Sequence, residues 1–460
     1  MNTRFLVRAI LAAASLAAFN ASAADLKEVY ERALTNDPLI REAEANRLAT
    51  RESKPQALAA LLPQVNADGT WNDSIDRNST GTFVAPGVPL TPDVRNFEGD
   101  SADWRLTLRQ SVFRWENWAT LKRADSERAQ AEADYLVAQQ DLILRAAVAY
   151  FDVLAARDTL EAAQAAHDAI GRQLEQSEKR FEVGLIAVTD VQDAKAAFDS
   201  ATAALIQAKR NLANAGELLR ELTGDTWDAL EKPGNDMPLS APNPANPEDW
   251  VKLAMDQNAS LISSRLAADI TRANINVERG GHVPAVDFVV SRGHDETDGT
   301  LTGTTDGDTS DSSYDTVYGL QVTVPIFSGG LTSSRVRQAQ YRHTAARERL
   351  ERTARQTERS TRDAYLGVNS EVARVQSLKQ AVESAQTALQ ATEAGYEVGT
   401  RTSVDVLQAR QRLFQSQTDY ARSRYDYLLN VLRLQLAAGT LDRQGLDDIN
   451  ALLSESVTVR

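Results

Sequence analysis

The sequence predicts a mainly α-helical protein that also carries membrane-type β-strands, and three observations support this fold class. Residues 93–232 and 326–460 contain no proline, which favours very long helices because proline interrupts a helix interior. Two other segments alternate apolar and polar residues with the period of a β-strand. The two halves of the chain also resemble each other, so each half should contribute the same set of elements.

Residues 1–23 are typical of a signal peptide. Arg4 and Arg8 precede an apolar run from Ala9 to Phe19, and residues 21–23 are the small residues expected before a cleavage site. The protein is therefore predicted to be exported. No later stretch approaches the ~18 apolar residues of a spanning helix. A mature chain that enters a membrane must then do so as β-strands.

Composition excludes most enzyme chemistry. The 460 residues include no cysteine and only four scattered histidines, so disulfides, cysteine-ligated metals and thiol catalysis are excluded. The net charge of −14 argues against a nucleic-acid partner. We expect no cofactor, no metal and no enzymatic activity.

Segments of the two halves match in the same order. Residues 36–40 correspond to 257–261, 106–113 to 320–327, 181–184 to 396–399, and 222–224 to 437–439. The spacing is about 215 residues, which is too long for a solenoid repeat. Duplication of a half-molecule is the simplest interpretation, and each half should contain a helix, a hairpin, a very long helix and a second helix.

The first helix of the chain contains Pro55, where we expect a kink or an early end. The very long helices are predicted over about Glu116–Glu182 and Gly330–Tyr396, each ~100 Å at 1.5 Å per residue. Within the first, apolar residues from Leu142 to Ala163 alternate steps of four and three, the seam of a coiled coil. The seam fits a hollow wall of helices or an ordinary extended coiled coil, and periodicity alone does not separate the two.

Each half also contains one predicted hairpin. Trp104, Leu106 and Leu108 alternate with polar residues in the first, and residues 317–324 alternate in the second. The polar segments Asp73–Asp100 and Asp295–Ser312 are expected to be solvated extracellular loops. The acidic residues of the second segment could bind calcium, but it has neither EF-hand nor glycine-rich calcium-repeat spacing. Because single-chain barrels have at least eight strands, four strands predict a β-barrel shared between two, three or four chains. The strand-to-helix joints at 115–117 and 329–331 differ in sequence and need not bend alike.

Residues 396–407 and their first-half counterpart 180–191 resemble a signature of the TolC family of outer-membrane efflux and secretion channels, and residues 425–440 resemble the closing helix of that family. The resemblance covers about residues 26–455. It implies a homotrimer with a 12-stranded β-barrel, a 12-helix coiled-coil tunnel in the periplasm and a mixed belt around its middle. The implied location is the outer membrane of a Gram-negative bacterium, with most of the mass in the periplasm.

The resemblance assigns a role to each segment. Tunnel helices would be 24–63, 114–220, 250–284 and 328–438, membrane hairpins 64–113 and 285–327, and equatorial segments 221–249 and 439–460. The implied partners are outer-membrane lipid, a periplasmic adaptor (membrane fusion) protein and an inner-membrane RND-type or ABC-type transporter. The chain would then be the exit duct of a tripartite efflux pump or a type I secretion system.

The resemblance also implies a periplasmic gate. Tyr396 would bond to Asp190 within a chain, and Arg401 would reach Thr189 and Asp190 of a neighbour. Without the resemblance, Asp190 reads as an ordinary helix N-cap.

Other site residues are implied at the two ends of the tunnel. Asp405 would form an acidic ring at the tunnel mouth, although Gln408 replaces a second acidic residue of the family. Gly184 and Gly399 would form turns that contact the adaptor, or simply end helices. The aromatic residues expected at the membrane interface are Trp104, Trp115, Trp118, Phe113 and Phe327, of which the two phenylalanines could equally pack the junction between barrel and tunnel.

Two other classes of protein fit the sequence less well than a channel does. A periplasmic coiled-coil adaptor or structural protein would account for the helices but not for the alternating hairpins. A carboxylate-based hydrolase has enough acidic residues but no predicted concave fold to hold a catalytic pair.

Overall fold

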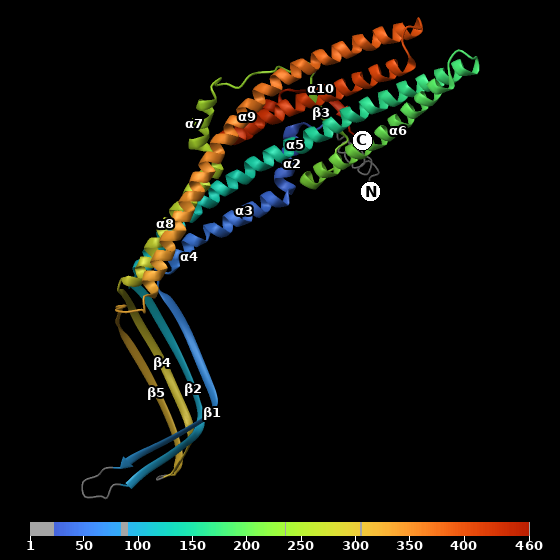
Figure 1. Cartoon of the computed structure of the whole chain (residues 1–460). Coiled ribbons are helices and arrows are strands. Elements are labelled where there is room, and N and C mark those ends of the chain that lie inside the picture. Colours follow the sequence, from blue (N-terminus) through green and yellow to red (C-terminus); the bar gives the residue numbers. More distant parts are fainter. Residues whose placement is uncertain (1–22, 84–90, 235, 304–305, 460) are drawn as a thin grey trace, which may run out of the picture. The chain divides into compact units, whose positions relative to one another are not determined.

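The computed structural model describes residues 23–83, 91–234, 236–303 and 306–459 (Figure 1). The expected signal peptide lies outside the described residues except for Ala23. The chain forms two compact units. The first comprises the described parts of Met1–Arg47, Glu132–Ser263 and Leu350–Arg460, and the second comprises those of Leu48–Ala131 and Ser264–Arg349.

Two very long helices dominate the chain, as predicted. Helix α5 runs over Trp115–Glu182 and α9 over Leu331–Glu397, so the expected bounds are correct to within a residue. Each is followed by a long partner, α6 (Val188–Thr223) or α10 (Ser403–Ala438). In the described chain, no helix is both long and apolar enough to cross a membrane.

The second unit contains a four-stranded antiparallel sheet in the order β1-β2-β4-β5. The strands are β1 (Gln64–Phe83), β2 (Thr91–Phe113), β4 (Ala285–Gly303) and β5 (Gly307–Thr323). The prediction of loops over Asp73–Asp100 and Asp295–Ser312 was wrong, because the strands continue through most of both segments. Backbone hydrogen bonds between strands do not depend on side-chain polarity, so a polar hairpin can stay paired.

The strand-to-helix joints differ, as expected. Only Arg114 separates β2 from α5, whereas residues 324–330 separate β5 from α9. In the second joint, Gly329 and Gly330 have φ angles of 62° and 82°, which non-glycine residues rarely adopt.

Shorter helices precede each hairpin. They are α2 (Leu26–Asn36), α3 (Pro38–Arg51) and α4 (Ser53–Ala59) in the first half, and α7 (Pro247–Gln257), α8 (Ala259–Arg279) and the 3₁₀ turn η1 (Gly280–His282) in the second. The helix predicted around Pro55 breaks between α3 and α4, as expected. The breaks at Asp37 and Asn258 were not predicted. Asp37 precedes a proline, which disfavours helical backbone, and the Asn258 side chain accepts a hydrogen bond from the Leu261 backbone at 3.0 Å.

Two segments expected near the equator form a small second sheet. Strand β3 (Ala229–Pro233) pairs with β6 (Leu453–Thr458), which follows helix α11 (Arg443–Asn450). Helices α6 and α10 stop just before this region at Gly224 and Gly439, whose φ angles are 76° and 78°. Both are the left-handed caps that glycine favours.

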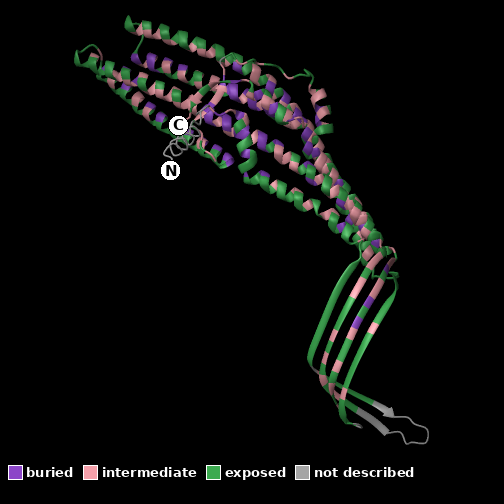
Figure 2. Cartoon of the chain, turned by 180° about the vertical axis from the view of Figure 1, so that it is seen from behind, coloured by how far each residue is buried: buried purple, intermediate pink, exposed green. Residues whose placement is uncertain are grey.

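The main core lies in the first unit, where buried residues of α5 and α10 form the largest groups of one cluster (Figure 2). The Phe151 and Tyr425 rings stack there at 5.7 Å. Tyr150 and Tyr365 are 215 positions apart, and both are buried. The Tyr150 hydroxyl donates to the Glu231 carbonyl at 2.5 Å, and the Tyr365 hydroxyl donates to the Ala245 carbonyl. Burial raises the pKa of Tyr150 and of Tyr425. These phenols are therefore neutral hydrogen-bond donors.

Candidate functional site

The turns that join the long helices hold most of the predicted gate. At the end of α5, Gly184 has φ 75°, and at the end of α9, Gly399 has φ 80°. Both residues cap a helix in the left-handed conformation, which confirms the expected tight turns. Val183 and Val398 beside them are 69% and 75% exposed, so each turn presents an apolar tip.

The two turns differ in how the next helix begins. Thr402 caps α10, and Asp405 accepts from both the Thr402 N–H and its hydroxyl at 2.9 Å, while the Thr402 hydroxyl accepts from the Asp405 N–H at 3.2 Å. These bonds, together with nearby Arg401, hold the pKa of Asp405 below its usual value. Asp405 is therefore an ionised carboxylate at the start of α10.

Helix α6 begins without such a cap. Its N-cap is Ala187, which has no side-chain hydrogen bond. The interpretation of Asp190 as an N-cap is therefore wrong, because Asp190 lies three positions further on. Its carboxylate has no partner among the residues that the structure describes, and Thr189 beside it is exposed.

Tyr396 contacts a residue that the sequence did not indicate. The guanidinium of Arg180 lies over its ring at 5.0 Å from the centroid, a cation–π contact. The Tyr396 hydroxyl is buried and has no hydrogen-bond partner in the described chain, so the predicted bond to Asp190 is not formed here.

Arg401 lies close to Gly395 in the turn. A Cβ atom on Gly395 would lie 2.8 Å from the Arg401 Cγ. The Arg401 side chain can therefore occupy this position only because residue 395 is a glycine. The Arg401 side chain is exposed in the single chain.

Arg410 is a functional candidate that sequence reasoning missed. It donates to the Glu393 carboxylate of α9 at 2.8 and 3.1 Å and to the Ala169 carbonyl of α5 at 2.9 Å. One largely buried side chain thereby joins three helices. The available signal was a charged residue within the apolar positions Val406 to Leu413 of α10.

The predicted interface aromatics lie in the second unit. Trp104 is in β2, Phe113 ends it, and Trp115 and Trp118 begin α5, while Phe327 lies in the joint before α9. All five are at least 42% exposed, and the Trp115 indole N–H donates to the Asn276 carbonyl at 3.0 Å.

The sheet has two chemically different faces. Leu106, Leu108, Tyr318 and Leu320 share one face by register. The opposite face holds Arg105, Gly293 and Asp315 in adjacent strands, where Arg105 reaches over Gly293 to Asp315 at 3.7 Å. An apolar outer face and a polar inner face are typical of a strand set placed between lipid and water.

Long paired helices together with this sheet define the class of an outer-membrane channel. The family model described as Outer membrane efflux protein matches residues 29–225 and 250–440. The chain therefore belongs to the outer membrane efflux protein family, and the expected outer-membrane location in a Gram-negative bacterium is confirmed.

Individual relatives agree with this assignment. The chain is 37% identical to Outer membrane protein TolC of Vibrio cholerae over 93% of this chain and 94% of that protein, and 37% identical to that of Escherichia coli over 98% and 89%. It is 28% identical to the alkaline protease secretion protein AprF of Pseudomonas aeruginosa over 94% and 88%. The crystal structure of the outer membrane protein VceC of V. cholerae shares the fold, with a TM-score of 0.70 at 22% identity over 90% of this chain and 96% of that one.

Proposed function

We propose that this chain is one subunit of a homotrimeric channel-tunnel that forms the outer-membrane exit of a tripartite efflux pump or a type I secretion system. The observation that carries the proposal is the four-stranded sheet with one apolar face, joined in a single chain to helices of 67 and 68 residues. The alternative class, a coiled-coil adaptor, does not account for such a sheet.

The edges of the sheet support a barrel shared between chains. Strands β1 and β5 each have one paired side in the order β1-β2-β4-β5. Free strand edges are costly within a membrane because their N–H and C=O groups need partners. Pairing β5 of one chain with β1 of the next satisfies both edges, and three chains give the 12 strands of the family resemblance.

The internal repeat is also part of the proposal. Buried positions recur 215 residues apart, as in Ala124 and Ala339, and Val153 and Val368. The caps Gly184 and Gly399 have the same spacing and similar φ angles. Duplication of a half-molecule would let three chains build a tunnel of six similar units.

Each segment then has a role. Residues 24–63, 114–220, 250–284 and 328–438 would line the tunnel, and hairpins 64–113 and 285–327 would span the membrane, with the five aromatic residues at its interface. Segments 221–249 and 439–460 would form the equatorial belt, for which the β3–β6 pairing is support.

The turns would form the gate at the periplasmic end. In the trimer, Arg401 would reach Thr189 and Asp190 of a neighbour, and the Asp190 carboxylate is available because no described residue occupies it. The Tyr396 hydroxyl, which has no partner in the single chain, would join the same cluster. Three copies of Asp405 would make the mouth acidic.

Partners follow from the exposed turn tips and from the relatives. Val183 and Val398 beside Gly184 and Gly399 would contact a periplasmic adaptor, which would couple the duct to an RND-type or ABC-type transporter. AprF is named for protease secretion and the family for efflux, so cargo of either kind fits the duct. No catalytic step is expected.

Single-channel conductance of the detergent-purified protein in planar bilayers tests the proposal. The wild type should give a small conductance, and Arg401→Ser should raise it several-fold, because three gate links are lost together. Arg412→Ser, at an exposed arginine within α10, is the matched control and should leave it unchanged. A folded, membrane-extracted oligomer without conductance would overturn the channel, whereas a large conductance that Arg401→Ser leaves unchanged would overturn only the gate.

A further inference from the structure

Two grooves in the first unit occupy related positions of the chain. The first-half groove, of about 630 Å³, lies between the start of α3, α5 and α6, and the second-half groove, of about 660 Å³, lies between the start of α8, α9 and α10. Lining positions of the two grooves pair 215 residues apart: Arg145 with Ser360, Val148 with Asp363, Ala149 with Ala364, Ala215 with Asn430, Leu218 with Arg433, Glu221 with Leu436, and Leu222 with Ala437. The grooves are therefore equivalent surfaces of the two halves.

Among the described residues, a helix of the other half of the chain lines the second-half groove but not the first-half groove. Val137, Gln140 and Asp141 of α5 also line it. Gln140 is 5% exposed, and its amide donates to the Leu441 carbonyl at 3.0 Å and to the Gly439 carbonyl at 3.5 Å. A first-half helix thus lies against the groove of the second half.

The equivalent covering residues of the second half are on α9 and are exposed. Adding 215 to the three α5 positions gives Arg352, Arg355 and Gln356, and the Arg355 side chain is 77% exposed. The lining of the first-half groove includes no described residue of α9, and its Leu39 and Leu218 are 56% and 59% exposed. One chain therefore has a groove without a covering helix and an exposed segment at the covering position. Arg355 of this segment pairs with Glu351 of its own helix, and Gln356 also lines the second-half groove.

We propose that residues 352–356 of a second copy of this chain cover the first-half groove, with Arg355 as the anchor. By the same spacing, Arg355 would donate to the carbonyls of Gly224 and Thr226, as Gln140 does to those of Gly439 and Leu441. The inference rests on the homo-oligomer of the proposed function and names the contact that builds it.

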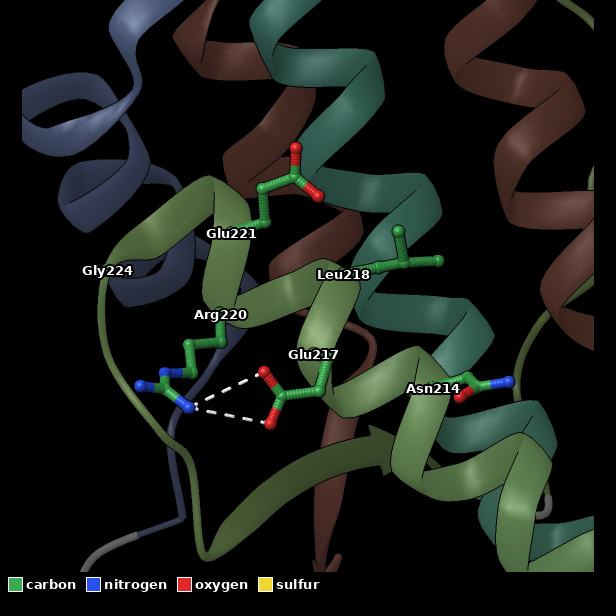
Figure 3. A pocket seen from close by; sticks show the side chains of 6 residues that line it. All are labelled: Asn214, Glu217, Leu218, Arg220, Glu221 and Gly224. Carbon is green, nitrogen blue, oxygen red and sulfur yellow. Dashed lines mark hydrogen bonds and ion pairs between the residues drawn. The ribbon is translucent and has the colours of Figure 1, made fainter.

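Charge favours this occupant. Glu217, Leu218, Arg220, Glu221 and Gly224 line a recess that adjoins the first-half groove, and Glu217 pairs there with Arg220 of its own helix at 3.4 Å (Figure 3). Glu221 has no ion-pair partner among the described residues, so its carboxylate would be available to Arg355. Arginine at the position of Gln140 adds a charge complement that the intrachain contact lacks.

The contact joins two different surfaces, so it is heterologous. Successive copies can then close a ring, and neither surface pairs with itself. This property separates the proposed contact from a symmetric dimer.

Disulfide cross-linking tests the contact directly, because the natural chain has no cysteine. Leu218→Cys with Arg355→Cys, oxidised in detergent-extracted protein, should give covalent dimers and trimers on a denaturing gel. Each single variant should remain monomeric, and so should Ile206→Cys with Arg355→Cys, whose α6 cysteine lies ~18 Å further along the helix.

Two results would overturn the contact. The first is a Leu218→Cys and Arg355→Cys protein that stays monomeric on the gel although its native mass is that of a trimer and it conducts in bilayers. The second is a dimer of Leu218→Cys alone. If native mass and conductance are both lost in the cysteine-free protein, the proposed function fails instead.

A charge swap gives an independent readout. Glu221→Lys should weaken the oligomer several-fold against dissociation by mild denaturant, and adding Arg355→Glu should restore part of that loss. Absence of any rescue in protein that is folded by circular dichroism would count against Arg355 as the anchor.

Discussion

Removal of the Arg410 side chain should open the periplasmic end of the channel. Arg410 links α9 through Glu393 and α5 through the Ala169 carbonyl, and the Arg410 side chain is only 19% exposed. The alanine variant leaves the carbonyl and the carboxylate without this donor. Helices α9 and α10 would then be free to move away from α5.

The size of the effect follows from the two partners. The Glu393 side chain is 38% exposed, so its ion pair contributes only ~0.5–1 kcal/mol after solvent screening. The bond from a charged donor to the partly buried Ala169 carbonyl contributes ~1.5 kcal/mol. Together they give ~2 kcal/mol per chain, which corresponds to ~30-fold in an open–closed equilibrium. In a trimer, three copies of the substitution would shift the open–closed equilibrium further toward the open state.

Bilayer conductance and native mass should be measured together. Arg410→Ala should conduct more than the wild type, and Glu393→Gln should have a smaller effect because the amide oxygen still accepts a hydrogen bond. Arg412→Ala, an exposed neighbour, should change nothing. An intact Arg410→Ala trimer with wild-type conductance would refute the reasoning that this link holds the helices closed.

Three further predictions concern the turns and the sheet. Gly395→Ala should raise conductance several-fold, because the new Cβ would lie 2.8 Å from the Arg401 Cγ and displace that side chain. Gly216→Ala is the control, because this helical glycine has open space beside it. Equal effects of the two variants would contradict the packing argument. Thr402→Ala should lower stability near neutral pH through loss of the cap. The folded-state pKa of Asp405 is lowered, so the stabilisation from its ionised carboxylate is complete above the ordinary carboxyl pKa and is lost as pH falls through the lowered value. The difference in unfolding midpoint between wild type and Thr402→Ala should therefore shrink in acid. A difference that grows in acid would refute this argument. Gly293→Val should lower the heat stability of the trimer on gels, because the new Cβ would lie 2.7 Å from the Asp315 carboxylate and block Arg105. Gly319→Val should leave the heat stability unchanged, because the space beside Gly319 is open. Equal losses of stability would exclude the cross-strand ion pair as the cause.

Periodicity and proline placement sufficed to predict the helices and the existence of the hairpins. The bounds of α5 and α9 were predicted to within a residue because long proline-free segments leave few alternatives. The hairpin length was not predictable in this way. Polar residues from Asp73 to Asp100 look like a loop, yet ladder hydrogen bonds pair them regardless of their side chains.

The site was predicted less completely than the fold. The left-handed turns at Gly184 and Gly399 follow from residue type alone. The Arg180–Tyr396 contact and the Arg410–Ala169 bond join residues that are far apart in sequence, and no local pattern specifies them. A charged residue within an apolar seam was the available clue for Arg410.

Unequal capping of the two halves gives the turns different mechanical roles. Thr402 and Asp405 fix the start of α10 through three hydrogen bonds, whereas Ala187 leaves the start of α6 without a side-chain cap. A carboxylate that already accepts hydrogen bonds in its own helix cap is a poor acceptor for a neighbouring chain, whereas a carboxylate without such bonds is a good acceptor. Asp190 would therefore be the better acceptor for an arginine from another subunit, because the start of α6 does not use that carboxylate in a cap. Divergence between duplicated halves would in this way convert one structural aspartate into a component of the gate.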